Sequence, residues 1–155
     1  MNYDILDVDL NSEISVKLSD FAKHCSFQGT GAYFAELIDE KAFEDYEKAF
    51  AVISDEKIIG FGALLKECLC LHEDKSPWLD FLFVDEKYRN FGIGKVLVEK
   101  ICEYAKIAGF DNIYLCTVTH ADYYKRAGFN ALYSTDYFNN MLNDRPIYIM
   151  KKEMS

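Results

Sequence analysis

One short segment of the sequence has the residue types of an anion-binding turn. A hydrophobic stretch ends at Val84, residues 85–95 are mainly polar or glycine, and a helix-forming sequence begins at about Gly94. The first turn of a helix has amide N–H groups without intrahelical partners and a partial positive charge, so backbone atoms can bind a diphosphate there. Gly92 and Gly94 carry no side chain that would block its approach. The segment therefore predicts a site for a phosphorylated ligand.

Two other phosphate-binding motifs need residues that this turn lacks. A P-loop has Lys followed by Ser or Thr, whereas Val96 follows Lys95. A dinucleotide-binding turn needs a further glycine three residues beyond Gly94, where this chain has Leu97. Glycine is also common before helices for conformational reasons, so the turn needs the support of a second segment.

That second segment, residues 124–129, begins with Tyr and ends with Gly-Phe. In residues 89–94, Arg89 is followed after two residues by Gly92 and after one more by Gly94. This segment resembles, at every specified position, the pyrophosphate loop of the GNAT superfamily of acetyl-CoA-dependent N-acyltransferases. Residues 124–129 resemble that family's Tyr, two or three residues, Gly, Phe segment. The resemblance covers about residues 78–130 and implies a mixed, V-shaped sheet with acetyl-CoA as cosubstrate.

The resemblance assigns the coenzyme to the strand and turn before the long helix. In the family this strand separates from its neighbour and its backbone binds the pantetheine arm; Leu82, Phe83 and Val84 occupy that position. The Val84 amide would polarise the thioester carbonyl and stabilise the oxyanion of the tetrahedral intermediate. Arg89 would add positive charge. The amides that would bind the pyrophosphate belong to Asn90, Phe91, Gly92, Ile93, Gly94 and Lys95.

Tyr124 matches the family's general acid, which protonates the departing thiolate of coenzyme A. The chain has 11 tyrosines, so it is the following Gly128 and Phe129 that support this assignment. The adjacent Tyr123 would point elsewhere on the same short helix, and we interpret it as a packing or rim residue.

The acceptor amine must also lose a proton, and family members differ in whether a carboxylate, a histidine or ordered water receives it. Asp80 lies four residues before Val84, so strict alternation along a strand predicts one shared face. A catalytic base and a satisfied structural carboxylate fit this position equally well. His120 is a second candidate, although a surface-loop histidine is the simpler interpretation. Shortly after the strand that ends near Val118, the family often has an Asn that contacts the pantetheine arm, whereas this chain has Thr117, Val118 and Thr119.

The charge of the chain is unevenly distributed. The formal net charge is -9, which argues against a general nucleic-acid binder because phosphate neutralisation needs clustered Lys and Arg. Residues 1–56 hold 13 acidic and 4 basic side chains, whereas residues 87–126 hold 4 and 7. An anionic ligand is therefore expected at the second stretch and a cationic amine acceptor beside the first. A solvated acidic surface kept for solubility is the alternative.

The remaining patterns favour a reduced, cytoplasmic protein. No apolar run approaches the roughly 20 residues of a membrane span, and residues 1–10 lack the pattern of a secretory leader. The 5 cysteines are an odd count without paired spacing, which indicates reduced thiols. Cys68, Cys70 and His72 alternate on an extended segment, but without a fourth ligand they predict packing and no metal site.

Hydrophobic periodicity predicts a mixed sheet with flanking helices. Expected strands are residues 3–8, 50–54, 57–66, 78–84, 112–118, 129–135 and 147–151. Expected helices are residues 12–24, one or two within 33–46, then 92–108 and 121–127. The strand, helix, strand succession over residues 78–118 predicts one parallel pair in a mostly antiparallel, twisted sheet.

The sequence as a whole therefore predicts a single GNAT-like domain over residues 1–155, with α/β architecture, as a monomer or homodimer. Its expected reaction is direct transfer of acetyl from acetyl-CoA to a primary amine, without a metal or a covalent enzyme intermediate. Two alternatives stay open: a non-catalytic module that senses acyl-CoA, and a protein acetyltransferase acting on an N-terminus or lysine.

Overall fold

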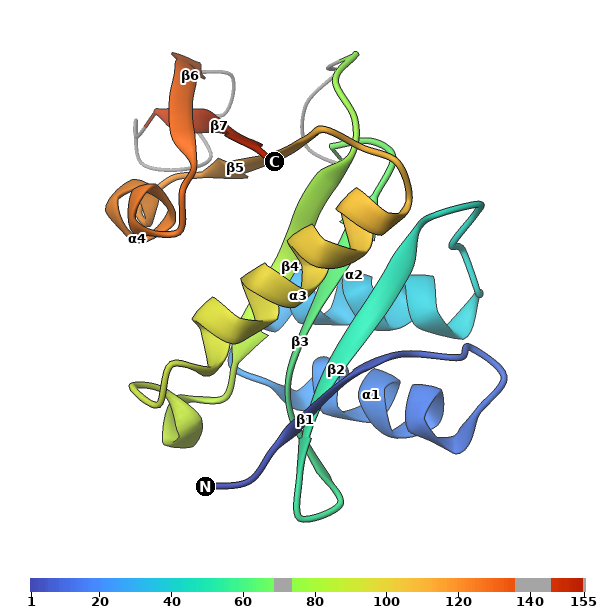
Figure 1. The fold of residues 1–155 in the computed structure, drawn as a ribbon. Coiled ribbons are helices and arrows are strands. Elements are labelled where there is room, and N and C mark those ends of the chain that lie inside the picture. Colours follow the sequence, from blue (N-terminus) through green and yellow to red (C-terminus); the bar gives the residue numbers. More distant parts are fainter. Residues whose placement is uncertain (69–73, 136–145, 155) are drawn as a thin grey trace.

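Seven strands form one sheet in the computed structural model, which describes residues 1–68, 74–135 and 146–154 (Figure 1). Along the sheet the strands follow the order β1-β2-β3-β4-β5-β7-β6. All neighbouring pairs are antiparallel except β4 and β5, which are parallel, so the predicted mixed sheet is confirmed. The strands are β1 (Asp4–Asp7), β2 (Lys48–Ser54), β3 (Lys57–Leu65), β4 (Trp78–Val84), β5 (Asn112–Thr117), β6 (Asn130–Thr135) and β7 (Ile147–Glu153).

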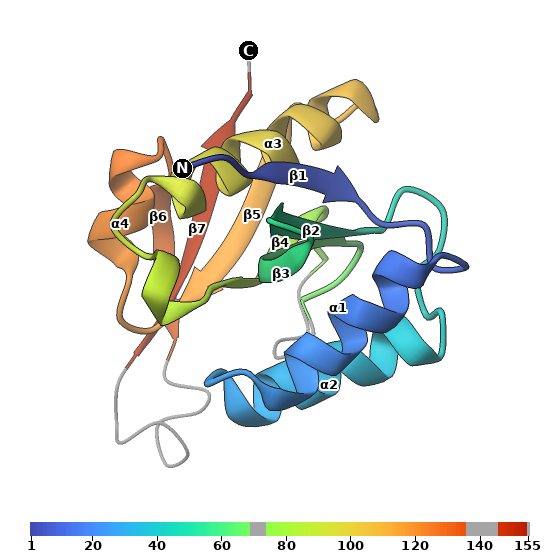
Figure 2. The same cartoon turned by 90° about the horizontal axis from the view of Figure 1, so that it is seen from below.

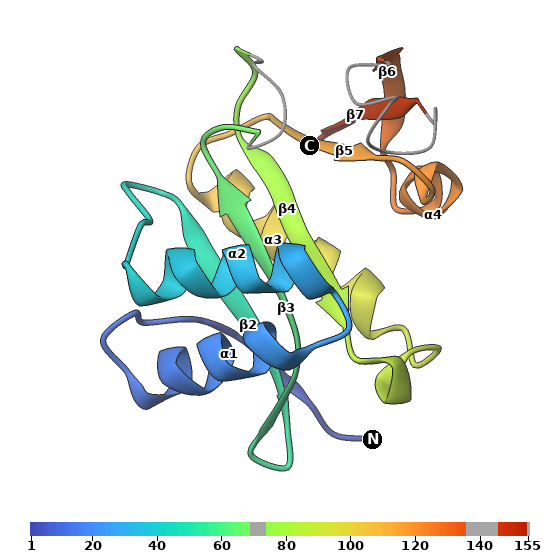
Figure 3. The same ribbon diagram turned by 180° about the vertical axis from the view of Figure 1, so that it is seen from behind.

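Helices cover both faces of the sheet (Figures 2 and 3). α1 (Glu13–His24) and α2 (Gln28–Asp39) lie on one face and α3 (Ile93–Ile107) on the other, while α4 (Ala121–Arg126) precedes β6. Alternation along β2 sends Ala51 into the hydrophobic cluster under α1 and α2 and Val52 into the cluster under α3. Among the described residues, no helix has both the length and the apolar character needed to cross a membrane.

The second helix differs from the helical stretch predicted over residues 33–46. It begins at Gln28, so Gly31 lies within the helix instead of before it. A Cβ atom at Gly31 would lie 2.4 Å from the Ala22 carbonyl oxygen, and the glycine therefore lets α1 and α2 pack closely. After α2 the backbone takes a positive φ of 53° at Lys41, which ends the helical run. The other predicted elements are confirmed to within a few residues.

Candidate active site

The parallel strands β4 and β5 separate soon after they pair. Trp78 of β4 is opposite Tyr114 of β5, and the Tyr114 amide donates to the Pro77 carbonyl at 3.0 Å. No other residue pair joins the two strands in the described part of the chain, and Figure 1 shows them diverging. β4 continues to Val84 with β3 on its other side. The splayed parallel pair expected from the sequence is therefore present, and one backbone edge of β4 is open.

The Val84 amide lies on this open edge. Val84 is opposite Gly60 of β3, while the next amide, that of Asp85, donates to the Ile59 carbonyl at 2.8 Å. Because successive N–H groups of a strand point to opposite sides, the Val84 amide points away from β3 and toward the gap. An N–H group in this position can bind a ligand carbonyl without giving up a bond within the sheet.

The turn after β4 leads into the N-terminus of α3 beside this gap. A 3₁₀ turn, η1 (Glu86–Tyr88), is followed by positive φ angles of 70° at Asn90 and 77° at Gly92, and α3 begins at Ile93. Ile93 is 1% exposed and anchors the helix, whereas Phe91 is 60% exposed. The first turn of α3, which contains Ile93, Gly94 and Lys95, therefore presents its free amides at the end of β4.

Arg89 folds back onto the strand that precedes it. Its Nε donates to the Val84 carbonyl at 2.8 Å, and its guanidinium carbon lies 5.5 Å from the centre of the Phe83 ring. The Arg89 guanidinium has no further partner among the described residues, so its other N–H groups can reach an anion. Of the other two strand residues, Leu82 packs against the cluster under α3, and the Phe83 side chain belongs to the cluster under α1 and α2.

Gly92→Ala is expected to lower the free energy of unfolding by about 1 kcal/mol, because an L side chain is strained in the left-handed region. Gly92 has φ 77°, and no atom lies within 4 Å of the position of an added Cβ, so conformation alone causes the loss. Gly29→Ala is the control, since Gly29 is equally open but helical. Urea denaturation measures both, and an unchanged Gly92→Ala variant would contradict this backbone conformation.

Asp80 lies on the opposite face of β4 from the one that the sequence predicted. Between the pairs Gly60–Val84 and Ala63–Asp80, β3 advances by three residues and β4 by four. The additional residue forms a bulge at Phe81, which has a φ of 58°. A bulge reverses the alternation beyond it, so Asp80 shares the face of Ala63, under α1 and α2, and not that of Val84. The prediction from strict alternation was wrong for this reason.

Asp80 is partly buried, and its Oδ1 accepts a hydrogen bond from the Phe81 amide at 2.7 Å. Burial raises the pKa of this carboxyl to about 6, and the amide bond opposes the rise only in part. A carboxylate with this pKa is deprotonated at neutral pH and can accept a proton more readily than an exposed one.

Asp80→Asn is expected to stabilise the fold at pH 7.5 by at most about 3 kcal/mol. The folded state binds the Asp80 proton more tightly than the unfolded chain, because its pKa is about 6 against an ordinary value of 3.8. Below pH 3.8, Asp80 is protonated in both the folded and the unfolded state, and its charge costs the fold no stability. As the pH rises from there through about 6, the free energy of unfolding falls, and the full cost of the buried charge is reached above this range. Urea denaturation at two pH values checks this: the gain should roughly halve at pH 5, and no gain at pH 7.5 would contradict the burial of a charged carboxylate.

Tyr124 is held by the turn that ends α4. The Phe129 amide donates to the Tyr124 carbonyl at 3.0 Å, and Gly128 takes the positive φ of 97° that this turn needs. Phe129 is 1% exposed, and its ring centre lies 5.9 Å from that of Tyr124. The Gly-Phe pair of the sequence motif thus forms the support behind the tyrosine.

The site brings together residues that are far apart in the chain. Burial raises the pKa of Tyr124 well above its ordinary value, and Tyr123, Asp80 and Cys116 nearby add to the rise. The Tyr124 phenol therefore stays protonated at neutral pH, as a general acid must. Asp80 of β4 and Tyr124 of α4 are close enough to interact electrostatically, so a potential base and a potential acid lie in one region.

His120 and the cysteine segment have other surroundings. His120 is exposed at the start of α4, where its amide donates to Thr117 Oγ1 at 3.1 Å and its Nδ1 lies 2.9 Å from Thr119 Oγ1. Cys68 is buried with its Sγ 3.8 Å from that of Cys116, while Cys70 and His72 lie outside the described residues. Within the described ranges, no three His, Cys, Asp or Glu side chains are grouped to hold a metal ion.

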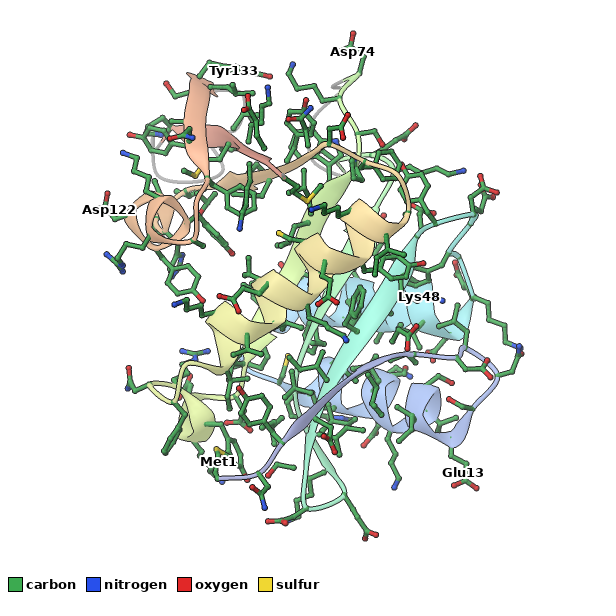
Figure 4. The ribbon with its side chains drawn as sticks, viewed as in Figure 1. Met1, Glu13, Lys48, Asp74, Asp122 and Tyr133 are labelled. Atoms are coloured by element: carbon green, nitrogen blue, oxygen red, sulfur yellow. The ribbon has the colours of Figure 1, made fainter. Side chains whose placement is uncertain are left out.

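Tyr123 is a residue whose position the sequence did not indicate. Its hydroxyl lies 2.7 Å from the point that a Cβ atom of Gly94 would occupy, so the side chain packs against α3, in agreement with the packing interpretation. The preceding residue, Asp122, extends outward from α4 in Figure 4. A six-residue helix is too short for hydrophobic periodicity to reveal which of two adjacent tyrosines faces inward.

A surface hollow of about 600 Å³ lies elsewhere, beside the C-terminal half of α1. Phe21 and His24 of α1, Lys57 of β3, and Phe83 and Asp85 at the end of β4 contribute to its lining. Neither Tyr124 nor the turn at residues 89–94 does. This hollow is therefore distinct from the gap between β4 and β5.

An open strand edge, a turn with free amides and a partly buried tyrosine thus lie around the gap between the two splayed strands. The chain matches the model of the Acetyltransferase (GNAT) family over residues 16–129. It therefore belongs to this family of acetyltransferases. No curated protein matches the chain.

Several solved structures share the fold. The chain is 19% identical to the aminoglycoside 6'-N-acetyltransferase from Enterococcus faecium, with a TM-score of 0.75 over 97% of this chain and 96% of that one. It is 18% identical to a GNAT-family acetyltransferase from Streptococcus pneumoniae, with a TM-score of 0.73 over 99% and 100%. A GNAT acetyltransferase from Elizabethkingia anophelis with acetyl-CoA bound is 17% identical, with a TM-score of 0.67 over 99% of each chain. At these identities the likeness establishes the fold.

Proposed function

We propose that this protein is an acetyl-CoA:amine N-acetyltransferase. The observation that carries the proposal is the open edge of β4, with the Val84 amide facing the gap and the turn at residues 89–94 at the end of the same strand. Extended pantetheine can bind such an edge as a further strand would, while its diphosphate meets the first turn of α3. The structure with acetyl-CoA bound in a protein of the same fold supports this choice of cosubstrate.

Two side chains supply the proton transfers. The amine nitrogen attacks the thioester carbon, and the Val84 amide donates to the resulting oxyanion. Asp80, with a pKa of about 6, accepts the proton that the amine loses, directly or through water. When the C–S bond breaks, Tyr124 donates its proton to the sulfur, and the products are the N-acetylated amine and coenzyme A. No covalent bond to the enzyme is required.

A cationic amine is the proposed acceptor. Asp80 faces the α1–α2 side of the sheet, and residues 1–56, which include both helices, hold 13 acidic and 4 basic side chains. A negative field on this side would favour the approach of a cation. The aminoglycoside 6'-N-acetyltransferase fold relative supports an amine acceptor in general.

An acceptor screen that monitors thiol release from acetyl-CoA tests the proposed function. Small cationic amines should give the highest kcat/KM, and peptides with a free N-terminus or lysine and acidic amines serve as comparison. Better turnover of peptides would favour the protein acetyltransferase. Binding of acetyl-CoA without transfer to any acceptor would favour the sensor module and contradict the enzyme.

A further inference from the structure

The Tyr123 side chain reaches across the gap between the two splayed strands. It belongs to α4, which follows β5, yet its hydroxyl contacts the first turn of α3, which follows β4. A Cβ atom added at Gly94 would lie 2.7 Å from this hydroxyl and 4.0 Å from Val84 Cγ2. The Tyr123 hydroxyl and the Val84 side chain therefore both approach Gly94, so α4 and β4 come together at the first turn of α3.

The direction of this contact places the hydroxyl beside the free amides. Cα–Cβ bonds of a helix tilt toward its N-terminus, so the missing Gly94 Cβ marks the N-terminal side of the first turn of α3. The structure offers the Tyr123 hydroxyl no hydrogen-bond partner among the described residues. Burial raises the pKa of Tyr123, with the positive charge of Arg126 opposing the rise, so the group remains a donor at neutral pH.

We propose that the Tyr123 hydroxyl donates a hydrogen bond to the diphosphate of acetyl-CoA at the place where the diphosphate meets the amides of the first turn of α3. The Tyr124 ring holds the Tyr123 ring edge-on, with centroids 5.2 Å apart and planes at 84°. Tyr123 is thus a recognition residue next to the proposed general acid. The inference rests on the proposed function, since it needs the coenzyme in the gap.

Calorimetric titration of Tyr123→Phe with two ligands tests this inference. Coenzyme A carries the diphosphate, and pantetheine has the same arm and thiol without it. The variant keeps the ring and its packing, so Kd for coenzyme A should rise about tenfold, as for loss of one hydrogen bond to a charged group, while Kd for pantetheine should change less than about twofold. Tyr104→Phe, at the far end of α3, is the control and should bind both ligands as the unaltered protein does.

Each other outcome has a defined meaning. Equal losses for both ligands would assign the hydroxyl to the arm that they share. An unchanged or lower Kd for coenzyme A would show that the hydroxyl makes no favourable contact with the diphosphate. Each of these results overturns the inference and leaves the proposed function intact. If the unaltered protein bound neither ligand, the coenzyme site itself would be refuted.

Discussion

Tyr124→Phe should lower kcat for acetyl transfer by about 100-fold or more, the usual contribution of a positioned general acid. The variant lacks only the proton that the departing thiolate needs, while the ring contact with Phe129 that holds the side chain remains. The Kd for acetyl-CoA should therefore change less than about twofold, since the assigned coenzyme contacts are backbone amides, Arg89 and the Tyr123 hydroxyl. Steady-state kinetics together with calorimetric binding separates the two quantities.

Tyr104→Phe provides the matched control for this loss. Tyr104 is also a partly buried tyrosine, but it lies in the last turn of α3, with its ring 5.5 Å from that of Phe50. Removal of its hydroxyl should leave kcat unchanged. If Tyr124→Phe turned over acetyl-CoA at the rate of the unaltered protein, Tyr124 would lose its assigned role.

Asp80→Asn should lower kcat/KM by about 100-fold and change the shape of its pH profile. Because Asp80 must be deprotonated to act, activity of the unaltered protein should fall as the pH drops below the Asp80 pKa of about 6. Asparagine cannot accept the proton, yet it can still accept the hydrogen bond from the Phe81 amide. The variant should therefore fold well and show no acidic limb with this pKa.

Asp122→Asn is the carboxylate control, because Asp122 is exposed on α4 beside the site. Its pH profile should retain the acidic limb near pH 6. An Asp80→Asn variant that kept the same limb would mean that another group accepts the proton, with ordered water or His120 as the remaining candidates. The stability gain predicted for the same substitution would then be unaffected, since it depends on the raised pKa of Asp80 and not on its role in catalysis.

Much of the scaffold could be predicted because its signals are local. The strand that ends at Val84, the glycines of the following turn and the periodicity of α3 each depend on residues within one element, and the structure has them at the predicted positions. The Gly128-Phe129 pair also had a local meaning: it forms the turn and the packing behind Tyr124.

The features that were missed depend on contacts between elements. The bulge at Phe81 shifts β4 against β3, and a period of two contains no sign of it, so Asp80 was assigned to the wrong face. Gly31 lies before the helical stretch predicted over residues 33–46, although its lack of a side chain serves the contact of α2 with Ala22 of α1. The contact of Tyr123 with Gly94 joins α4 to α3 and leaves no pattern in either segment.

A crystal structure with acetyl-CoA bound tests the proposed coenzyme site most directly. We expect the pantetheine arm along the open edge of β4, the Val84 amide within hydrogen-bond distance of the arm or thioester, and the diphosphate on the amides of residues 90–95. A coenzyme bound outside the gap between β4 and β5, or a turn whose amides are filled by the protein's own atoms, would contradict it.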